Sequence, residues 1–334
     1  MSDLSLRLRD ALDRSAAGAS TVALTAAVER LSDRYRSVRP AGAPILAGPA
    51  EVLAYAVYRM PATYAAVRLA LLQGVRAGLG PISSVADLGG GTGAAVWAAA
   101  EALPDVRAAT VLEQVAAARD LGRAIAAEDL GETSWRDWRV GEPVPSADLV
   151  SAAYVLSELS EEQQTRLVAD AMAAAGAAVL VVEPGTPDGH RRVLAARELL
   201  LAAGWRVLAP CPHALACPLA DADWCHFAAR VNRSALHRRV KSAELSHEDE
   251  KFSYVLAVRR STRQDLGDGA RDARSIVRGG RVVRHPLKRK GLVELQLCRP
   301  DGTAGREVVS KRHGAAYKAA RDVAWGDTWP PAAD

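Results

Sequence analysis

The stretch S-V-A-D-L-G-G-G-T-G-A, residues 84–94, decides the fold, because an apolar strand runs directly into a cluster of glycines. Residues 84–88 predict a strand, and the alanine-rich residues 94–102 predict a helix after the loop. Glycines let a ligand approach the backbone, and the free N–H groups at a helix N-terminus attract polar or anionic groups. The stretch therefore predicts a cofactor pocket where the strand ends.

Strands and helices continue to alternate after this loop. The alternation is typical of a doubly wound α/β sheet, and a nearly all-apolar strand fits a parallel strand buried on both faces. Helices are also expected before the loop, with a break at the Met60-Pro61 step. We expect strands over 109–112, 135–140, 147–151, 177–182, 205–209 and 252–258, and helices over 3–37, 50–78, 115–127, 161–174 and 188–203.

The chain divides into three regions. Residues 1–80 form an N-terminal helical region, and residues 81–260 form the sheet domain. Between the last two strands of this domain, the alternation of strands and helices is interrupted by a cysteine-rich insertion over 210–250. Residues 273–325 form a basic C-terminal β domain, in which we expect a small barrel and a final helix over 315–323.

Five residues are candidate cofactor ligands. Gly89, Gly91 and Gly93 leave room for the cofactor, and Glu113 ends the second strand, where a carboxylate can accept hydrogen bonds from two ribose hydroxyls. Asp87 precedes the glycines and can attract an ammonium group, which favours S-adenosylmethionine. The dinucleotide fingerprint also fits the spacing, and a glycine turn without a ligand is a third reading.

No catalytic residue is predicted. An enzyme that methylates amino groups carries Asn or Asp, two prolines and an aromatic residue after the fourth strand, whereas this chain has S-A-A-Y at 151–154. A C5-methylating enzyme needs a cysteine near that strand, and the sequence has none there. Glu183 either replaces the missing polar group or shapes a turn, and Asp137 either reaches the adenine or is a surface acid.

The four cysteines are candidate metal ligands. Three share one loop, C-P-H-A-L-A-C-P-L-A-D-A-D-W-C over 211–225, and the fourth lies far downstream. Clustered thiols in a reducing compartment more often bind metal than form disulfides. Gaps of five and seven residues are wide for a zinc site, so the spacing favours a [4Fe–4S] cluster, with zinc as the alternative. The ligands would be Cys211, Cys217, Cys225 and Cys298.

The net charge is +4, but the charged residues are unevenly distributed along the chain. Residues 274–321 hold thirteen Lys or Arg and three acids, a net charge of +10, which leaves −6 for the rest of the chain. We also expect a basic helix over 230–241, beside the cysteine loop. Such segments indicate a polyanionic partner, most often nucleic acid, with a merely solvated basic surface as the alternative reading.

The composition, 49% hydrophobic and 25% charged, is that of a globular protein. The longest apolar run, 171–182, is too short to span a bilayer. Acids at Asp3, Asp10 and Asp13 are unlike an organellar transit peptide. We therefore expect a cytoplasmic protein with no membrane partner.

Six motifs together resemble the methyltransferase-like family of mitochondrial small-ribosomal-subunit assembly factors, of which this chain looks like a bacterial member. The cysteine block is the most specific of them, whereas the glycine loop is shared by countless methyltransferases. The resemblance covers about residue 45 to the end. Its motifs are A-D-L-G-G-G-T-G at 86–93, D-L-V-S-A-A-Y-V-L-S-E-L at 148–159, C-P-H-A-L-A-C-P-L at 211–219, D-W-C-H-F at 223–227, E-D-E-K-F-S-Y at 248–254 and S-K-R-H-G at 310–314.

The resemblance implies a class I (Rossmann-like) methyltransferase sheet with an inserted iron–sulfur segment. It also implies a [4Fe–4S] cluster on the four cysteines, and binding to small-subunit ribosomal RNA in the pre-ribosomal small subunit. We therefore expect an assembly factor that keeps an S-adenosylmethionine pocket and a structural cluster. The alternatives are an active S-adenosylmethionine-dependent rRNA methyltransferase, and an iron–sulfur sensor that couples RNA binding to iron or oxygen.

Overall fold

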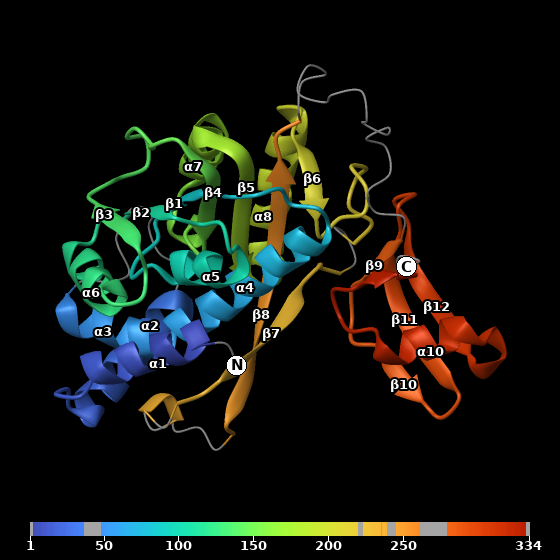
Figure 1. The fold of residues 1–334 in the computed structure, drawn as a ribbon, viewed down its shortest axis with the longest axis horizontal. Helices are drawn as coiled ribbons and strands as arrows, with labels where there is room; N and C mark the ends of the chain where they lie inside the picture. Colours follow the sequence, from blue (N-terminus) through green and yellow to red (C-terminus); the bar gives the residue numbers. More distant parts are fainter. Residues whose placement is uncertain are drawn as a thin grey trace.

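The computed structural model describes residues 3–36, 48–219, 223–234, 236–238, 245–260 and 279–331. Its main feature is an eight-stranded sheet with helices on both faces (Figure 1). The strands run in the order β3-β2-β1-β4-β5-β8-β6, and β7 pairs with β8 outside this path. They are β1 Ser84–Leu88, β2 Ala108–Leu112, β3 Glu132–Arg136, β4 Ala147–Ala153, β5 Ala175–Pro184, β6 Arg206–Ala209, β7 Phe227–Asn232 and β8 His247–Val258.

The strand pairing agrees with the expected methyltransferase sheet. Strands β1 to β5 pair in parallel, and β8 lies antiparallel between β5 and β6. Strand β1 has β2 on one side and β4 on the other, so the strands that follow in the sequence are added first on one side of β1 and then on the other. At such a topological switch point, ligands bind beyond the carboxyl ends of the strands. The glycine loop follows β1 and therefore lies at this edge.

Two apolar layers hold the helices against the sheet. On β5, Leu180 and Val182 enter one buried cluster with α4 and α5, while Val179 and Val181 enter another with α7 and α8. This alternation follows from the two-residue period of a strand, and it explains why β5 is apolar throughout. The helices are α1 Asp3–Ser15, α2 Thr21–Arg36, α3 Pro49–Tyr58, α4 Met60–Arg76, α5 Ala94–Ala102, α6 Ala116–Ala126, α7 Glu161–Ala174 and α8 Pro187–Ala202.

Residues 227–232 form a strand, so the basic helix expected over 230–241 is wrong at its start. Phe227, Ala229 and Val231 are buried and alternate with more exposed residues, which is a period of two. Strand β7 pairs antiparallel with the first half of β8. Helical backbone occurs only at residues 236–238 within the described part of this segment, and residues 239–244 lie outside it. The third strand also comes earlier than expected, over 132–136 rather than 135–140.

A second, five-stranded sheet follows near the C-terminus, in the order β10-β11-β9-β13 with β12 paired to β11. Among the described strands, no pairing closes this sheet on itself, so the expected barrel is wrong. Helix α10 contacts β11 and β12. The elements are β9 Gly280–Val282, β10 Leu287–Arg289, β11 Leu292–Cys298, β12 Ala304–Ser310, α10 Ala315–Asp322 and β13 Thr328–Trp329.

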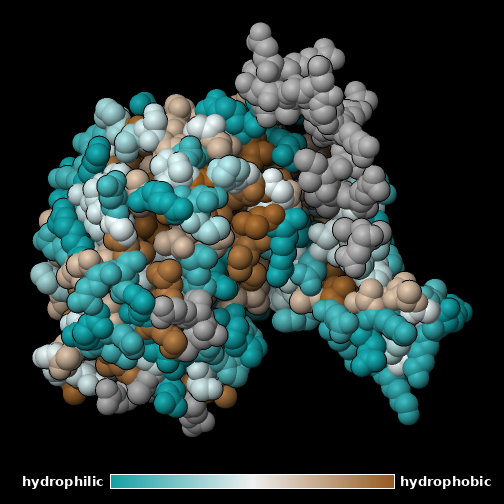
Figure 2. Space-filling view, in the orientation of Figure 1, coloured by the Kyte–Doolittle hydropathy of each residue, from teal (hydrophilic) through white to brown (hydrophobic). Residues whose placement is uncertain are grey.

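Cations gather on the exposed end of this second sheet, which Figure 2 shows as a mostly hydrophilic lobe. The Lys311 backbone N–H donates to the Gly291 carbonyl oxygen at 3.0 Å, which brings the β10–β11 turn beside the turn after β12. Both turns are exposed and basic. We call their cations the basic patch: Lys288, Arg289, Lys290, Lys311 and Arg312.

No helix among the described residues is both long enough and apolar enough to cross a membrane.

Candidate cofactor pocket and thiol cavity

The glycine loop joins β1 to α5 through left-handed backbone. Gly89, Gly91 and Gly93 have φ angles of 65°, 55° and 89°, a region that glycine adopts without steric cost. The Gly89 N–H donates to the Leu112 carbonyl oxygen at 2.8 Å, which fixes the loop to the end of β2. Gly93 is the N-cap of α5. The three predicted glycines thus form one loop at the expected edge of the sheet.

Asp87 lies buried beneath this loop, with 1% of its surface exposed. Its Oδ1 accepts a hydrogen bond from the Ser151 hydroxyl at 2.7 Å. Burial raises the pKa of Asp87 to about 7, against the lowering effect of the Ser151 bond. A Cβ on Gly90 would lie 2.4 Å from Asp87 Oδ2, so the second glycine of the loop is required by this carboxylate. A buried carboxyl group of this kind favours a cationic ligand, because the positive charge of the bound ligand stabilises the ionised carboxylate.

Glu113, at the end of β2, faces the same loop. Its Oε2 accepts from the Gly91 N–H at 3.0 Å, and its Oε1 accepts from the Val115 N–H at 2.8 Å. Burial raises the pKa of Glu113, and the backbone hydrogen bonds act in the opposite direction. A carboxylate has about four acceptor positions, so two remain for ribose hydroxyls. Glu113 therefore orders the loop as well as facing the expected ribose position.

The N-terminal helices cover the loop. Tyr55 of α3 lies within 4 Å of the position that a Cβ on Gly91 would take. The Thr92 hydroxyl donates to Met60 Sδ at 3.2 Å at the start of α4. Sequence reasoning did not identify Tyr55, because nothing in the helix pattern indicates which loop a helix packs against. Asp137, by contrast, is exposed and paired with Arg119 at 3.2 Å.

Tyr154, which directly follows β4 where methyltransferases usually carry catalytic residues, belongs to a group of three bonded side chains. Tyr154 has a φ of 61°, a rare conformation for a residue with a bulky side chain. Its hydroxyl donates to Glu250 Oε1 at 3.0 Å, and Arg59 donates to both oxygens of Glu250 at 2.9 and 3.2 Å. The Arg59 guanidinium also lies 5.5 Å from the centre of the Tyr154 ring. This Arg59–Glu250–Tyr154 link connects α4, β8 and the segment after β4.

Glu183 shapes the backbone around it. It is fully buried, and its two oxygens accept from the Leu156 N–H at 3.0 Å and from Arg192 Nε at 2.7 Å. Burial raises the pKa of Glu183 to about 7, although Arg192 lowers it. Both oxygens are thus engaged in holding the segment after β4 and helix α8, which agrees with the turn-shaping reading of this residue.

All four cysteines line one cavity with an empty volume of about 530 Å³. Cys211 and Cys217 come from the loop after β6, Cys225 from just before β7, and Cys298 from the end of β11. All four are free thiols. His213 joins them, because its Nε2 lies 3.3 Å from the Cys298 Sγ. The structure therefore brings the fourth cysteine, which 72 residues separate from Cys225 in the sequence, to the other three.

Burial controls the charge state of these thiols. It raises the pKa of Cys211 and of Cys298, the latter to about 12, and it raises that of Cys225 well above the ordinary value. Each of these thiols is also affected by the charge of its neighbours, which shows how closely they gather. Among the described residues, no group of three or more His, Cys, Asp or Glu side chains is arranged to hold a single metal ion.

Two buried arginines flank the thiols. Arg197 of α8 is 1% exposed and donates to the carbonyl oxygens of His213 and Leu215 at 3.0 and 2.8 Å. Arg281 of β9 is 3% exposed, and its Nε donates to the Pro210 carbonyl oxygen at 2.9 Å. Their positive charges lower the pKa values of Cys211 and Cys298. Sequence reasoning missed both, although a charge within the apolar stripe of α8 was a usable signal for Arg197.

Comparison with known proteins identifies a family that matches most of this chain. Residues 49–330 match the family model described as mitochondrial small ribosomal subunit Rsm22. The human mitochondrial ribosome assembly protein METTL17 is 32% identical over 200 residues, which cover 56% of this chain and 40% of the human protein. The Rsm22-cox11 tandem protein 2 of Schizosaccharomyces pombe is 28% identical over 225 residues, 55% of this chain and 29% of the yeast protein. Each match thus spans less than half of the relative.

Solved structures resemble this chain at low sequence identity. A putative RNA methyltransferase from Pyrococcus horikoshii has 14% identity and a TM-score of 0.41, and covers 69% of this chain and 97% of its own. Magnesium protoporphyrin IX methyltransferase from Synechocystis, solved with S-adenosylmethionine, has 12% identity and a TM-score of 0.40, with 69% and 91% covered. The strand order, taken from the pairing itself, is what assigns the methyltransferase sheet.

Proposed function

Because this chain belongs to the mitochondrial small ribosomal subunit Rsm22 family, we propose that it is an assembly factor that binds small-subunit rRNA within the pre-ribosomal small subunit. The family match carries this proposal, since it runs from α3 through the main sheet to the C-terminal sheet. The role is proposed for a bacterial cytoplasm, where thiols stay reduced.

The basic patch is the proposed rRNA contact. Its five cations lie on strand β10, on the turn that follows it and on the adjacent turn after β12, and they face solvent, where lysine and arginine can pair with phosphates. Other basic residues of this region have a different role. Arg281 is buried against the thiol loop, and Arg284 donates to the Trp224 carbonyl oxygen at 3.1 Å. The +10 segment therefore divides into an outward-facing group and a group that holds the C-terminal sheet.

A [4Fe–4S] cluster is the proposed occupant of the thiol cavity, held by Cys211, Cys217, Cys225 and Cys298. The donor set fits, because four thiols line one cavity and two buried guanidinium groups offset the negative charge of a thiolate-ligated cluster. Zinc is the alternative metal. Either group would supply folding free energy by joining segments that are distant in the sequence.

S-adenosylmethionine is the proposed ligand of the glycine loop. Gly89, Gly91 and Gly93 would accept the close approach of the cofactor, Glu113 would accept from the ribose, and Asp87 would attract the ammonium group. The cofactor carries an activated methyl group. Binding without methyl transfer is the proposed state, because Tyr154 at the catalytic position is already bonded to Glu250. An active rRNA methyltransferase is the second candidate, favoured by the intact loop.

One experiment tests the assembly role against this second candidate. Full-length protein, purified under anaerobic conditions, is incubated with immature small subunits and methyl-labelled S-adenosylmethionine, and both binding and label in rRNA are measured. We expect salt-dependent binding to immature subunits with no stoichiometric label. Stoichiometric label in rRNA would establish the methyltransferase instead, and failure to bind immature subunits at low salt would contradict the assembly role.

A further inference from the structure

A second binding groove lies away from both the glycine loop and the thiols. It runs between α1, α4 and β7 as two adjoining hollows with cavity volumes of about 90 and 360 Å³. The hollows share Ser5, Tyr64, Ala65, Arg230 and Asn232, so they form one continuous channel, which we call the α1–β7 groove. The second hollow, with about 360 Å³, is of the size that accommodates a small organic molecule or one monomer of a polymer.

Two buried polar atoms in this groove have no hydrogen-bond partner among the described residues. They are the Tyr64 hydroxyl and Glu101 Oε2. Tyr64 is 6% exposed, and the Glu101 side chain is 8% exposed, with its other oxygen bonded to Arg68. A buried polar group without a hydrogen-bond partner is unfavourable, so a ligand that bonds to both atoms would be stabilised here. One atom is a donor and an acceptor, and the other is an acceptor.

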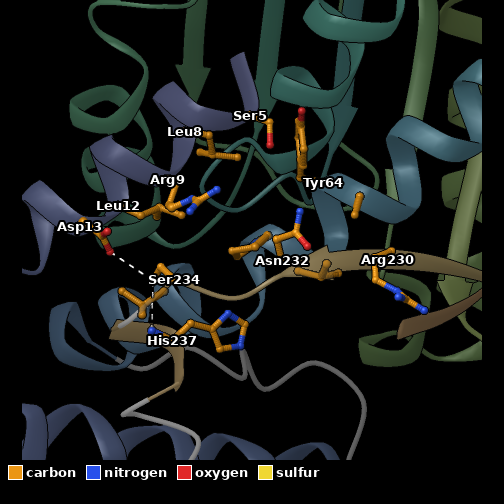
Figure 3. A pocket seen from close by; sticks show the side chains of 14 residues that line it. Ser5, Leu8, Arg9, Leu12, Asp13, Tyr64, Arg230, Asn232, Ser234 and His237 are labelled. Atoms are coloured by element: carbon orange, nitrogen blue, oxygen red, sulfur yellow. Dashed lines mark hydrogen bonds between the residues drawn. The ribbon is translucent and has the colours of Figure 1, made fainter. Parts of the chain in front are cut away.

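The rest of the groove has an apolar wall and cationic openings. Leu8, Leu12 and Val231 line the first hollow, where a flat ring can pack. Arg9 of α1 and Asn232 of β7 extend into the same space in Figure 3. Arg68 lines the second hollow and is about two-fifths exposed, so its remaining N–H groups are open to an anion.

We propose that the α1–β7 groove binds one unpaired nucleotide of RNA, with its base between the apolar wall and the orphaned Tyr64 and Glu101 atoms. Every nucleobase places hydrogen-bond donors and acceptors side by side on one planar edge, which matches a hydroxyl and a carboxylate oxygen. The phosphates on either side reach the guanidinium groups of Arg9 and Arg68. Proteins that recognise an RNA sequence mostly bind such unstacked, single-stranded bases.

This inference rests on the proposed RNA-binding function and adds a site that reads an unstacked base. The basic patch supplies charge on the C-terminal sheet, whereas this groove lies beside the N-terminal helices. The groove would bind a free nucleotide and a nucleotide within an RNA strand through the same contacts. A mononucleotide and an oligonucleotide are therefore used as separate probes to distinguish these two ligands.

Tyr64→Phe is the central variant. It keeps the ring and removes only the unpaired hydroxyl, so the protein should be as stable as the wild type or slightly more stable. The first probe is cytidine 5′-monophosphate, which lacks the adenine of the proposed cofactor. We expect Tyr64→Phe to weaken its binding, measured by calorimetry, about tenfold. Tyr317→Phe, in the C-terminal helix, is the matched control and should bind like the wild type. Equal affinity of Tyr64→Phe and the wild type would overturn the site.

The second probe is a short single-stranded RNA with either an intact base or one abasic position. The abasic change should cost the wild type about tenfold in affinity and cost Tyr64→Phe little. If intact and abasic RNA bind equally while binding still falls with salt, the groove site is wrong and the rRNA-binding role stands. If cytidine 5′-monophosphate binds with dependence on Tyr64 while no RNA binds, the groove holds a free nucleotide and the rRNA-binding role is wrong.

Discussion

Arg281 Nε donates to the carbonyl oxygen of Pro210 at 2.9 Å, so the first strand of the C-terminal sheet is bonded to the residue before Cys211. The same guanidinium donates to Gln73 Oε1 at 2.9 Å and to the Gly326 carbonyl oxygen. One buried arginine of β9 therefore connects α4, the thiol loop and the segment just before β13. Its charge also faces the thiols, which gives it a structural and an electrostatic role.

Arg281→Met should weaken the attachment of the C-terminal sheet. The change keeps the length of the side chain but leaves three acceptors without their buried donor, which we expect to cost about 2–4 kcal/mol of unfolding free energy. Denaturant unfolding measures this cost. Arg299→Met, in the connection between β11 and β12, is the control and should change stability by about 0.5 kcal/mol or less. Equal midpoints for the two variants would contradict the role of Arg281.

Cys298→Ser should release the C-terminal sheet from the proposed cluster while sparing the glycine loop. Cys298 is the only ligand candidate on that sheet, so its loss removes the link between two regions of the chain. We expect reduced iron and sulfide content after anaerobic purification, and faster proteolysis of the C-terminal sheet. Binding of S-adenosylmethionine should stay unchanged. Stoichiometric zinc without sulfide in the wild type would replace the cluster with zinc, and unchanged protease resistance would count against the link.

Asp87→Asn should change the pH dependence of stability. The pKa of Asp87 is about 7 in the folded protein, above its ordinary value of 3.8, so the folded state holds the proton more tightly. This contribution to stability is complete below pH 4 and is lost as pH rises through 7. The stability of the variant relative to the wild type should therefore rise between about pH 4 and pH 7, by up to about 1.4 kcal/mol per pH unit, and should level off above pH 7. A difference that does not vary with pH would refute the shifted pKa.

The same variant tests the cofactor pocket. Protonation of Asp87 removes the carboxylate that attracts the ammonium group, so wild-type affinity for S-adenosylmethionine should fall as pH drops below about 7. Asp87→Asn should bind more weakly above pH 7 and show a flatter profile. Calorimetry at pH 6 and pH 8 gives both values. Parallel profiles for the two proteins would exclude a direct role for this carboxylate.

Glu250→Gln should loosen the covering helices. Glu250 receives two hydrogen bonds from Arg59 and one from Tyr154, and its side chain is only 13% exposed. Removing its charge leaves the guanidinium group without a counterion, at an expected cost of about 2–4 kcal/mol. Asp249→Asn is a matched control on the same strand, because the Asp249 pair with Arg230 is exposed and should contribute less than about 1 kcal/mol. Similar losses in both variants would refute the distinction.

The main sheet was predictable because local patterns determine it. Strand 84–88 and helices 94–102 and 161–174 match the structure at both ends, since apolar period and glycine position mark where each element begins and ends. Strand β7 was missed for the opposite reason. The alanines and arginines of residues 227–232 favour a helix locally, and pairing with β8 overrides that preference.

The sequence by itself determined the glycine loop, the carboxylates at the strand ends and the four thiols, because these depend on residue type and short spacing. Only the tertiary structure decided which groups meet across the chain. It brought Cys298 to the thiol loop, buried Arg197 and Arg281 beside it, and bonded Tyr154 to Glu250. Such contacts depend on how layers pack, and packing joins residues that no sequence period relates.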